Sequence, residues 1–180
     1  MIFSEKLSIM VILDTSGSMG LAEKCLSNAL LTRLLGDETS SHRFAKIYKI
    51  LYHDRAEQSN GLDLFNWHAN GGTRCSPAFV EALNVTQNLS PHEQSNLLII
   101  HISDGDNERL DGPASLQLLL QLLHCCKHFA YIEMNTYHRK SSLTKTFADI
   151  NNDRFSTHII ETTTQIDGCL QSIRRQVFKM

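Results

Sequence analysis

A short polar loop follows the first apolar run of the chain. The run Leu7–Leu13 is continuous, and the loop after it, Leu13–Gly20, reads LDTSGSMG. Asp14, Ser16 and Ser18 place a carboxylate and two hydroxyls at alternate positions, so a curved loop can turn them the same way. Glycines let the backbone bend closely around a bound group. The loop is therefore expected to hold a phosphate, a substrate or a metal ion.

Two further segments add oxygen-bearing side chains. Thr73 follows a Gly-Gly pair in NGGTRCSP, and Asp104 lies in the loop SDGDNE directly after a second apolar run. Runs as apolar as those before Asp14 and Asp104 are typical of parallel strands buried at the centre of a sheet. Ligands of such sheets bind beyond the carboxyl ends of the strands. We therefore expect these loops to meet at one edge of a sheet.

Two carboxylates and three hydroxyls make a hard site that contains only oxygen atoms. Such a site suits Mg2+ or Mn2+ and is poor for zinc. Mg2+ takes about six ligands and keeps several waters, so five side chains, some acting through water, leave a position open. A carboxylate from a partner protein could fill that position. The predicted metal ligands are Asp14, Ser16, Ser18, Thr73 and Asp104.

The elements that would position these loops alternate between strand and helix. Strands are predicted at Leu7–Leu13, Phe44–Tyr52, Asn96–Ser103, Phe129–Asn135 and Arg154–Ile160, with a short edge strand at Leu62–Trp67. Helices are predicted over Met19–Leu35, from Ser76 as N-cap with Pro77 as first helical residue, from Gly112, near Leu143–Ile150 and over Ile166–Val177. This alternation predicts an α/β fold, a doubly wound and mostly parallel sheet of about six strands with helices on both faces.

Length and composition narrow the class of protein. The 180 residues suffice for one domain with a full core, and no linker divides them, so a single domain over residues 1–180 is expected. Charged residues make up 20% and the net charge is −2, which favours neither a nucleic-acid binder nor a membrane-surface protein. There is no membrane-length apolar run, no signal-peptide layout and no paired cysteine spacing. A soluble, cytoplasmic protein with free thiols is expected.

The three polar segments together resemble a known family. DTSGS resembles the Asp-x-Ser-x-Ser element of the von Willebrand factor A (vWA) family, GGT its second element and SDGDN its third. In that family the three elements form the metal-ion-dependent adhesion site (MIDAS). The resemblance covers nearly the whole chain and implies the Rossmann-like vWA fold. It also implies that Ser16, Ser18 and Thr73 offer hydroxyl oxygens to the ion, and that Asp14 and Asp104 often act through water.

The resemblance implies a function as well. Members of the vWA family bind protein partners and are generally not enzymes, and intracellular members often work beside AAA+ ATPases or inside multi-protein complexes. We therefore expect a metal-dependent interaction module or adaptor that binds an Asp or Glu side chain of its partner protein through the bound ion. Integrin-type members carry acidic residues for a second cation just after the first motif. Residues Met19–Ala22 occupy that place here, so no second cation site is expected.

Two other functions stay open. A Mg2+-dependent phosphohydrolase would also place an aspartate after its first strand, but phosphatases of the haloacid-dehalogenase type need a second aspartate where this chain has Ser16. The other alternative is a scaffold whose metal site is vestigial. His124 and His128 in HCCKH are four apart, as zinc ligands can be, but the segment ends an apolar helix and lacks C-x-x-C spacing, so no zinc site is expected there. His101 is expected to be a core residue because it lies within a buried strand. Cys75 is expected to be a small packing residue.

Overall fold

A six-stranded sheet forms the centre of the fold. The computed structural model describes residues 6–36, 44–61 and 72–178. The strand order is β3-β2-β1-β4-β5-β6, and every neighbouring pair is parallel except β2 and β3. The predicted α/β class with a mostly parallel sheet is confirmed. The strands are β1 (Ser8–Asp14), β2 (Ile47–Tyr52), β3 (Ala56–Gln58), β4 (Leu97–Ser103), β5 (His128–Met134) and β6 (Phe155–Ile160).

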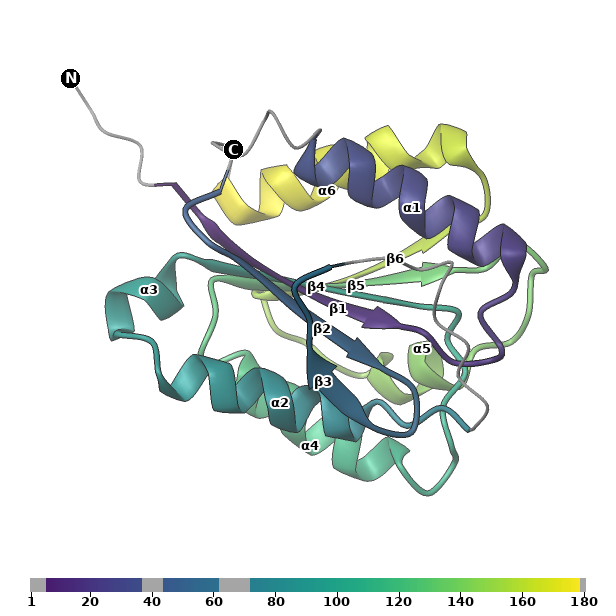
Figure 1. Ribbon diagram of the computed structural model, residues 1–180, viewed down its shortest axis with the longest axis horizontal. Helices are drawn as coiled ribbons and strands as arrows, with labels where there is room; N and C mark the ends of the chain where they lie inside the picture. Colours follow the sequence, from purple (N-terminus) through teal and green to yellow (C-terminus); the bar gives the residue numbers. More distant parts are fainter. Residues whose placement is uncertain (1–5, 37–43, 62–71, 179–180) are drawn as a thin grey trace.

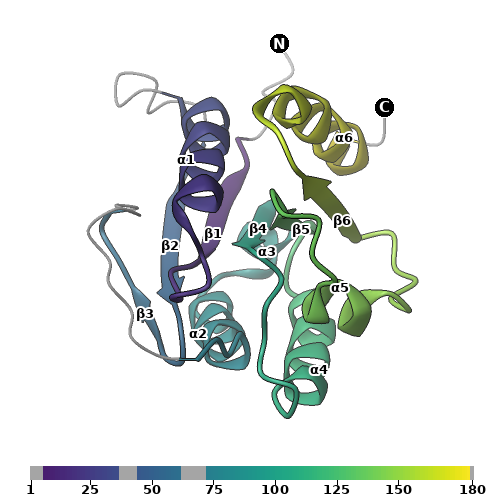
Figure 2. The ribbon, with the colours of Figure 1, turned by 90° about the vertical axis from the view of Figure 1, so that its right-hand side faces the viewer.

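Helices cover both faces of this sheet, as a doubly wound fold requires (Figure 1). One face carries α1 (Leu21–Leu35) and α6 (Ile166–Phe178), which is preceded by the 3-10 turn η2 (Thr163–Gln165). Figure 2 shows α2 (Ser76–Gln87), α4 (Gly112–Leu122) and α5 (Ser142–Phe147) on the opposite face. The short α3 (Pro91–Ser95) leads into β4. None of the described helices is long and apolar enough to cross a membrane.

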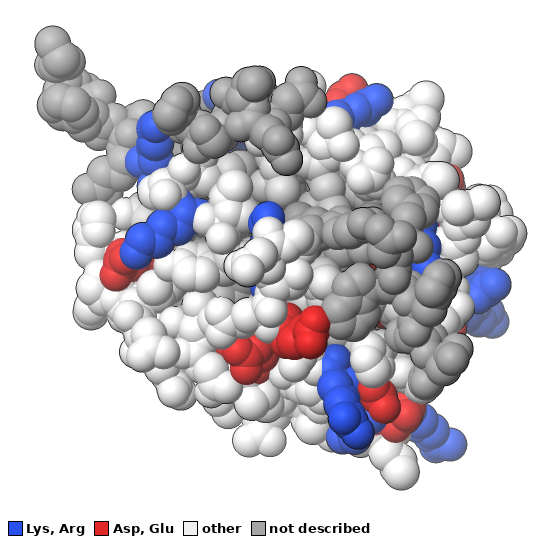
Figure 3. All heavy atoms as spheres, viewed as in Figure 1, with Lys and Arg blue, Asp and Glu red and all other residues white. Residues whose placement is uncertain are grey.

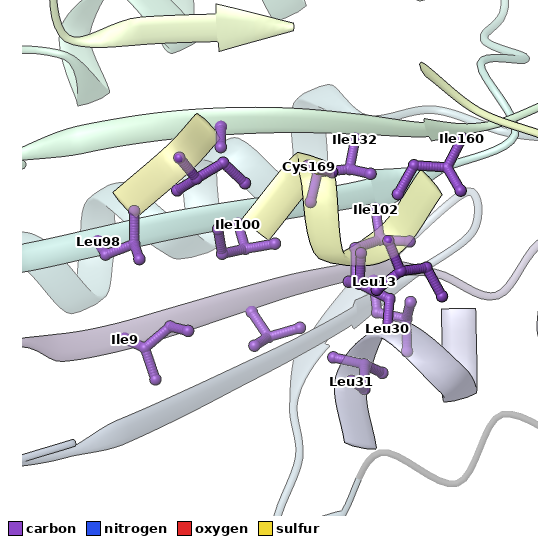
Figure 4. Packing of buried hydrophobic residues seen from close by; sticks show 14 of the residues in the cluster. Ile9, Leu13, Leu30, Leu31, Leu98, Ile100, Ile102, Ile132, Ile160 and Cys169 are labelled. Carbon is purple, nitrogen blue, oxygen red and sulfur yellow. The ribbon is translucent and has the colours of Figure 1, made fainter. Parts of the chain in front are cut away.

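Each face of the sheet has its own apolar core. In β1, Ile9, Val11 and Leu13 pack toward α1 and α6, whereas Met10 and Ile12 pack toward α2 and α4. Burial on both faces explains why β1 and β4 are mostly apolar along their length and do not alternate between apolar and polar residues. Figure 4 shows the first of these cores, in which side chains of β1 and β4 lie against those of α1 and α6; the labelled residues include Ile9, Leu13, Leu30, Leu31, Ile100, Ile102 and Cys169.

The start of α2 differs from the prediction that Ser76 is its N-cap. Cys75 is the N-cap and Ser76 is the first helical residue. The Ser76 N–H donates to Asp111 Oδ2 at 3.0 Å, and the Ser76 hydroxyl donates to the other oxygen of the same carboxylate. Asp111 lies in the loop between β4 and α4 and is 5% exposed. A carboxylate from a distant loop therefore replaces the local hydroxyl cap that the sequence pattern indicates.

Several other boundaries also differ. The predicted edge strand Leu62–Trp67 lies outside the described residues, and the edge strand that we observe is β3, antiparallel to β2. The helix α3 was not predicted, although Ser90 and Glu93 form a capping box at its start. The helix α1 begins at Leu21 rather than Met19, β2 begins at Ile47 rather than Phe44, and α5 spans Ser142–Phe147 rather than Leu143–Ile150.

Charged side chains of both signs are interspersed on the surface that Figure 3 shows. Neither Lys and Arg nor Asp and Glu form a continuous area there, and the net charge of the chain is −2. Proteins that track a nucleic-acid backbone present a basic stripe or groove. The described residues visible on this face form no such surface.

Candidate metal centre

The loops that carry the predicted ligands meet at the carboxyl end of the sheet, which faces the viewer in Figure 2. The strands β1 and β4 are direct neighbours, with Leu13 paired to Ile102. Asp14 is the last residue of β1, and Ser103 is the last residue of the neighbouring β4. Asp104 directly follows Ser103 in the sequence. Adjacent parallel strands thus bring together two acidic residues that are 90 positions apart in the sequence.

Asp14 is fully buried, and both of its carboxylate oxygens accept hydrogen bonds. The Ser16 N–H donates to Oδ1 at 2.8 Å, and the Ser103 hydroxyl donates to Oδ2 at 2.8 Å. The next residue, Thr15, anchors the loop by donating its N–H and its hydroxyl to the Tyr52 carbonyl, at 2.7 and 2.9 Å. These contacts hold the Asp14 carboxylate in one orientation.

The hydroxyls of Ser16 and Ser18 lie side by side, with their oxygens 3.0 Å apart. The curved loop thus turns both hydroxyls the same way. Asp104 Oδ1 accepts the Asp106 N–H at 3.0 Å, whereas Asp104 Oδ2 is buried and has no hydrogen-bond partner among the described residues. An unpartnered oxygen on a buried carboxylate is costly unless a cation or water binds it.

Both carboxylates have raised pKa values. Burial, and after it the nearby charge of Asp104, raises the pKa of Asp14 from 3.8 to about 7, against the opposing hydrogen bonds from Ser16 and Ser103. Burial also raises the pKa of Asp104, against hydrogen bonds from the Asp106 N–H and from Ser18. Among the described residues, no positively charged group lowers the pKa of either carboxylate, and a bound divalent cation would provide the balancing charge.

Thr73 reaches this end of the sheet through its backbone. Thr73 is 7% exposed, and its backbone carbonyl accepts a hydrogen bond from the Glu108 N–H at 2.8 Å. The Cys75 N–H donates to Asn107 Oδ1 at 3.0 Å, so the segment before α2 is fastened to the loop that begins with Asp104. In the described part of the chain, no hydrogen bond joins the Thr73 hydroxyl to the other predicted ligands. The structure therefore brings Asp14, Ser16 and Ser18 into direct contact and places Asp104 close enough for its charge to act on Asp14. Thr73 is attached to the Asp104 loop by the backbone of its own segment.

Ser103 supports the site and was not among the predicted residues. Besides donating to Asp14, its hydroxyl accepts the Gly105 N–H at 3.0 Å. The signal that could have found it is its position, because Ser103 directly precedes Asp104 at the end of the second apolar run. Farther inside, Tyr52 hydroxyl and His101 Nε2 are 2.7 Å apart, and burial lowers the pKa of His101 to about 3. His101 is thus a neutral core residue.

The donor set fits a hard cation rather than zinc. Across residues 6–36, 44–61 and 72–178, no three His, Cys, Asp or Glu side chains gather as metal ligands. His128, one of the two histidines of HCCKH, is buried in β5 and lies 2.8 Å from the Ser156 hydroxyl. Burial raises the pKa of the Cys75 thiol, whose Sγ lies 2.9 Å from Ser115 Oγ. The candidate centre therefore depends on hydroxyl oxygens in addition to two carboxylates, a combination that Mg2+ and Mn2+ accept.

Solved structures share this fold at low sequence identity. BatB from Bacteroides thetaiotaomicron superposes with a TM-score of 0.63 at 15% identity, over 96% of this chain and 99% of that chain. An aerotolerance-related membrane protein from Bacteroides fragilis gives 0.61 at 14% identity, over 97% and 100%. The manganese-loaded TRAP protein of Plasmodium vivax gives 0.62 at 14% identity, over 92% and 72%. These similarities support a vWA-like fold and, at such identities, show the fold alone.

Bacterial proteins and a family model match this chain in sequence. A UPF0229 protein of Bacillus cereus (strain B4264) and one of Bacillus anthracis (strain CDC 684 / NRRL 3495) are each 29% identical to this chain over 174 residues, which is 95% of this chain and 44% of the relative. The chain thus spans less than half the length of these relatives. The family described as "Protein of unknown function (DUF444)" matches residues 4–176. Because this match extends over nearly the whole sequence, the chain belongs to the DUF444 family.

Proposed function

We propose that this chain is a protein-interaction module that holds Mg2+ or Mn2+ and uses the ion to bind an acidic side chain of a partner protein. The observation that carries the proposal is the pair of buried, neighbouring carboxylates of Asp14 and Asp104, one of which has an unpartnered oxygen. Buried charges of one sign are stable only when a counter-charge is present. The vWA-like fold supports the proposal, and one structural neighbour is manganese-loaded.

The proposed ligands divide into groups with different roles. The hydroxyls of Ser16, Ser18 and Thr73 would offer neutral oxygens, and Asp14 and Asp104 would offer negative charge, directly or through water. Ser103 and the Ser16 N–H would keep the Asp14 carboxylate in place, as supporting residues do around metal sites. When bound, the ion would supply concentrated positive charge and a free coordination position for an Asp or Glu oxygen of the partner.

Exposed apolar side chains at the same end of the sheet favour a protein as the partner. Leu21 at the start of α1 is 71% exposed, Leu110 in the β4–α4 loop is 93% exposed, and Tyr137 in the β5–α5 loop is 60% exposed. All three come after the carboxyl ends of parallel strands, which is the end of the sheet where Asp14 and Asp104 also lie. Exposed large apolar side chains near a polar centre are typical of protein-binding surfaces. The expected partner therefore presents its acidic residue among apolar ones.

We further propose that the module binds without catalysing a reaction, and that it works in the cytoplasm within a larger complex, such as one containing an AAA+ ATPase. The resemblance to intracellular vWA proteins supports this part of the proposal. The hydroxyl of Ser16, at the position where a phosphatase of the haloacid-dehalogenase type has its second aspartate, contacts Ser18. Mg2+-dependent turnover of a phosphoester, lost in Asp14→Asn, would instead establish a phosphohydrolase. Partner binding with no cation binding would establish a vestigial site.

Affinity capture with and without the ion tests the proposed function. The immobilised chain is incubated with an extract of its source organism in Mg2+, and bound proteins are released with EDTA. We expect a partner that the wild-type chain retains only with Mg2+ and that Asp14→Asn does not retain. Asp153→Asn serves as the control, because Asp153 is exposed in the turn before β6, at the amino end of the sheet. Equal retention of the partner by Asp14→Asn and in EDTA would contradict the proposal.

A further inference from the structure

A third buried carboxylate lies on the first turn of α1, the helix that follows the Asp14 loop. Glu23 is only 3% exposed, although it carries a charge and follows the loop of Ser16 and Ser18 closely in sequence. Its Oε1 accepts a hydrogen bond from the Thr136 hydroxyl, which belongs to the β5–α5 loop. Its Oε2 is buried and has no hydrogen-bond partner among the described residues. Glu23 is thus a buried acid with one oxygen unpaired.

Helix capping does not explain this arrangement. A glutamate at the third position of a helix normally reaches back to the backbone N–H of the N-cap, as Glu93 does toward Ser90 in α3. Glu23 holds the equivalent position in α1, where Gly20 is the N-cap. Its Oε2 lies beside Gly20, close enough that a Cβ on that glycine would be 2.9 Å away, yet it accepts no bond there. The unpaired oxygen therefore needs another partner.

Glu23 and Asp104 belong to the same electrostatic environment. Burial is the main reason that the pKa of Asp104 is raised, and the charges of Asp106 and Glu23 raise it further. Asp104 Oδ2 is also buried without a partner in the described part of the chain. Both oxygens are buried carboxylate oxygens without a partner among the described residues. A hydrated cation at the carboxyl end of the sheet would satisfy such oxygens, because its waters donate hydrogen bonds outward.

We propose that Glu23 is the outer carboxylate of the metal centre: it accepts hydrogen bonds from water molecules on the ion, and its charge strengthens metal binding. This inference rests on the proposed metal binding. Glu23 is not a direct ligand beside Asp14 and Asp104, because no three such side chains of the described residues converge on one point. Thr136 holds the carboxylate in position by donating to Oε1.

The test compares Glu23→Gln with Glu93→Gln by calorimetric titration with Mg2+ and Mn2+ and by thermal unfolding in EDTA. Both variants lose one negative charge at the third position of a helix, but α3 lies at the opposite end of the sheet from the candidate centre (Figure 1). We expect Glu23→Gln to bind the ion about tenfold more weakly. We also expect it to unfold at a higher temperature than the wild type when metal-free. Glu93→Gln should bind the ion as the wild type does.

The outcomes separate this inference from the proposed function. A wild-type chain that binds neither ion refutes both. A wild-type chain that binds the ion, with Glu23→Gln binding it equally well, overturns the role of Glu23 alone, and so does a drop in the metal-free unfolding temperature with no change in affinity. If Glu23→Gln does not fold, Thr136→Val replaces it, because this variant keeps the charge and removes the hydroxyl that orients it. Wild-type affinity in Thr136→Val would then overturn the inference.

Discussion

Replacing Asp14 with asparagine should make the metal-free protein more stable at pH 8, although it removes a proposed metal ligand. Asp14 is fully buried, and its pKa in the folded protein is about 7 instead of 3.8, mainly because of burial and then the charge of Asp104. A carboxyl whose folded pKa lies above its unfolded value retains its proton longer in the folded state. The metal-free protein therefore loses stability as the pH rises from about 4 to about 7.

The size of the effect follows from these pKa values. A pKa of about 7 in place of 3.8 corresponds to about 4 kcal/mol of lost stability once Asp14 is ionised in the folded state. Asparagine keeps an oxygen for the Ser16 N–H, but its amide group cannot accept from the Ser103 hydroxyl, which costs about 1 kcal/mol. The expected net gain is about 3 kcal/mol at pH 8, or roughly 6–12 °C in a chain of this size. At pH 5 the two proteins should differ little.

The assay is thermal and urea unfolding in EDTA, followed by circular dichroism between pH 5 and pH 8. In both proteins His101 makes an opposing contribution, because burial lowers its pKa to about 3 and this contribution reduces the stability as the pH falls below 6.5. The difference between the variant and the wild type removes this shared contribution. Adding Mg2+ at pH 8 should stabilise the wild type, by about 2.7 kcal/mol at a hundred times its dissociation constant, and leave Asp14→Asn unchanged.

Two results would refute this reasoning. The variant could be less stable than the wild type at pH 8 in EDTA, which would mean that the Asp14 charge is already balanced inside the protein. Alternatively, the difference between the two proteins could stay constant across the pH range, which would mean that Asp14 does not titrate there. Stabilisation of Asp14→Asn by Mg2+ equal to that of the wild type would place the ion elsewhere.

Three substitutions test other parts of the site. Gly105→Ala should lower the free energy of unfolding in urea by about 2 kcal/mol or more, because Gly105 has φ +86° and a Cβ there would lie 2.8 Å from Glu133 Oε2. An unfolding midpoint equal to that of the wild type would contradict this strain. Asp111→Ala should lower the free energy of unfolding by about 3 kcal/mol, since it leaves the buried Ser76 N–H without its acceptor. A loss of less than about 1 kcal/mol would contradict a stabilising role of the hydrogen bond between Ser76 and Asp111. Thr73→Val should weaken Mg2+ binding in calorimetry about tenfold while stability stays within about 1 kcal/mol; unchanged affinity would remove Thr73 from the site.

The sheet and the position of the central loops could be predicted because they depend on local patterns. The strongly apolar runs before Asp14 and Asp104 identified the two central strands, and their pairing placed both aspartates at one edge. The alternate spacing of Ser16 and Ser18 likewise fixed how their hydroxyls turn.

Contacts between distant segments could not be predicted in this way. Nothing near Ser76 in the sequence indicates that Asp111 supplies the acceptor at the start of α2. The burial of Glu23 depends on its meeting with Thr136, more than 100 residues away. A glutamate in the first turn of a helix is ordinarily a solvent-exposed residue that complements the helix dipole. Glu23 is instead buried, because α1 packs against the β5–α5 loop that carries Thr136.

The most direct test of the proposed metal centre is a crystal structure of the chain grown with Mn2+, with the anomalous signal of the ion recorded. We expect one anomalous peak at the carboxyl end of β1 and β4, in contact with hydroxyl oxygens of Ser16, Ser18 and Thr73 and close to Asp14 and Asp104. A fully ordered site with no peak there, or a peak bound by other residues, would contradict the proposal that these loops form a metal-dependent binding site.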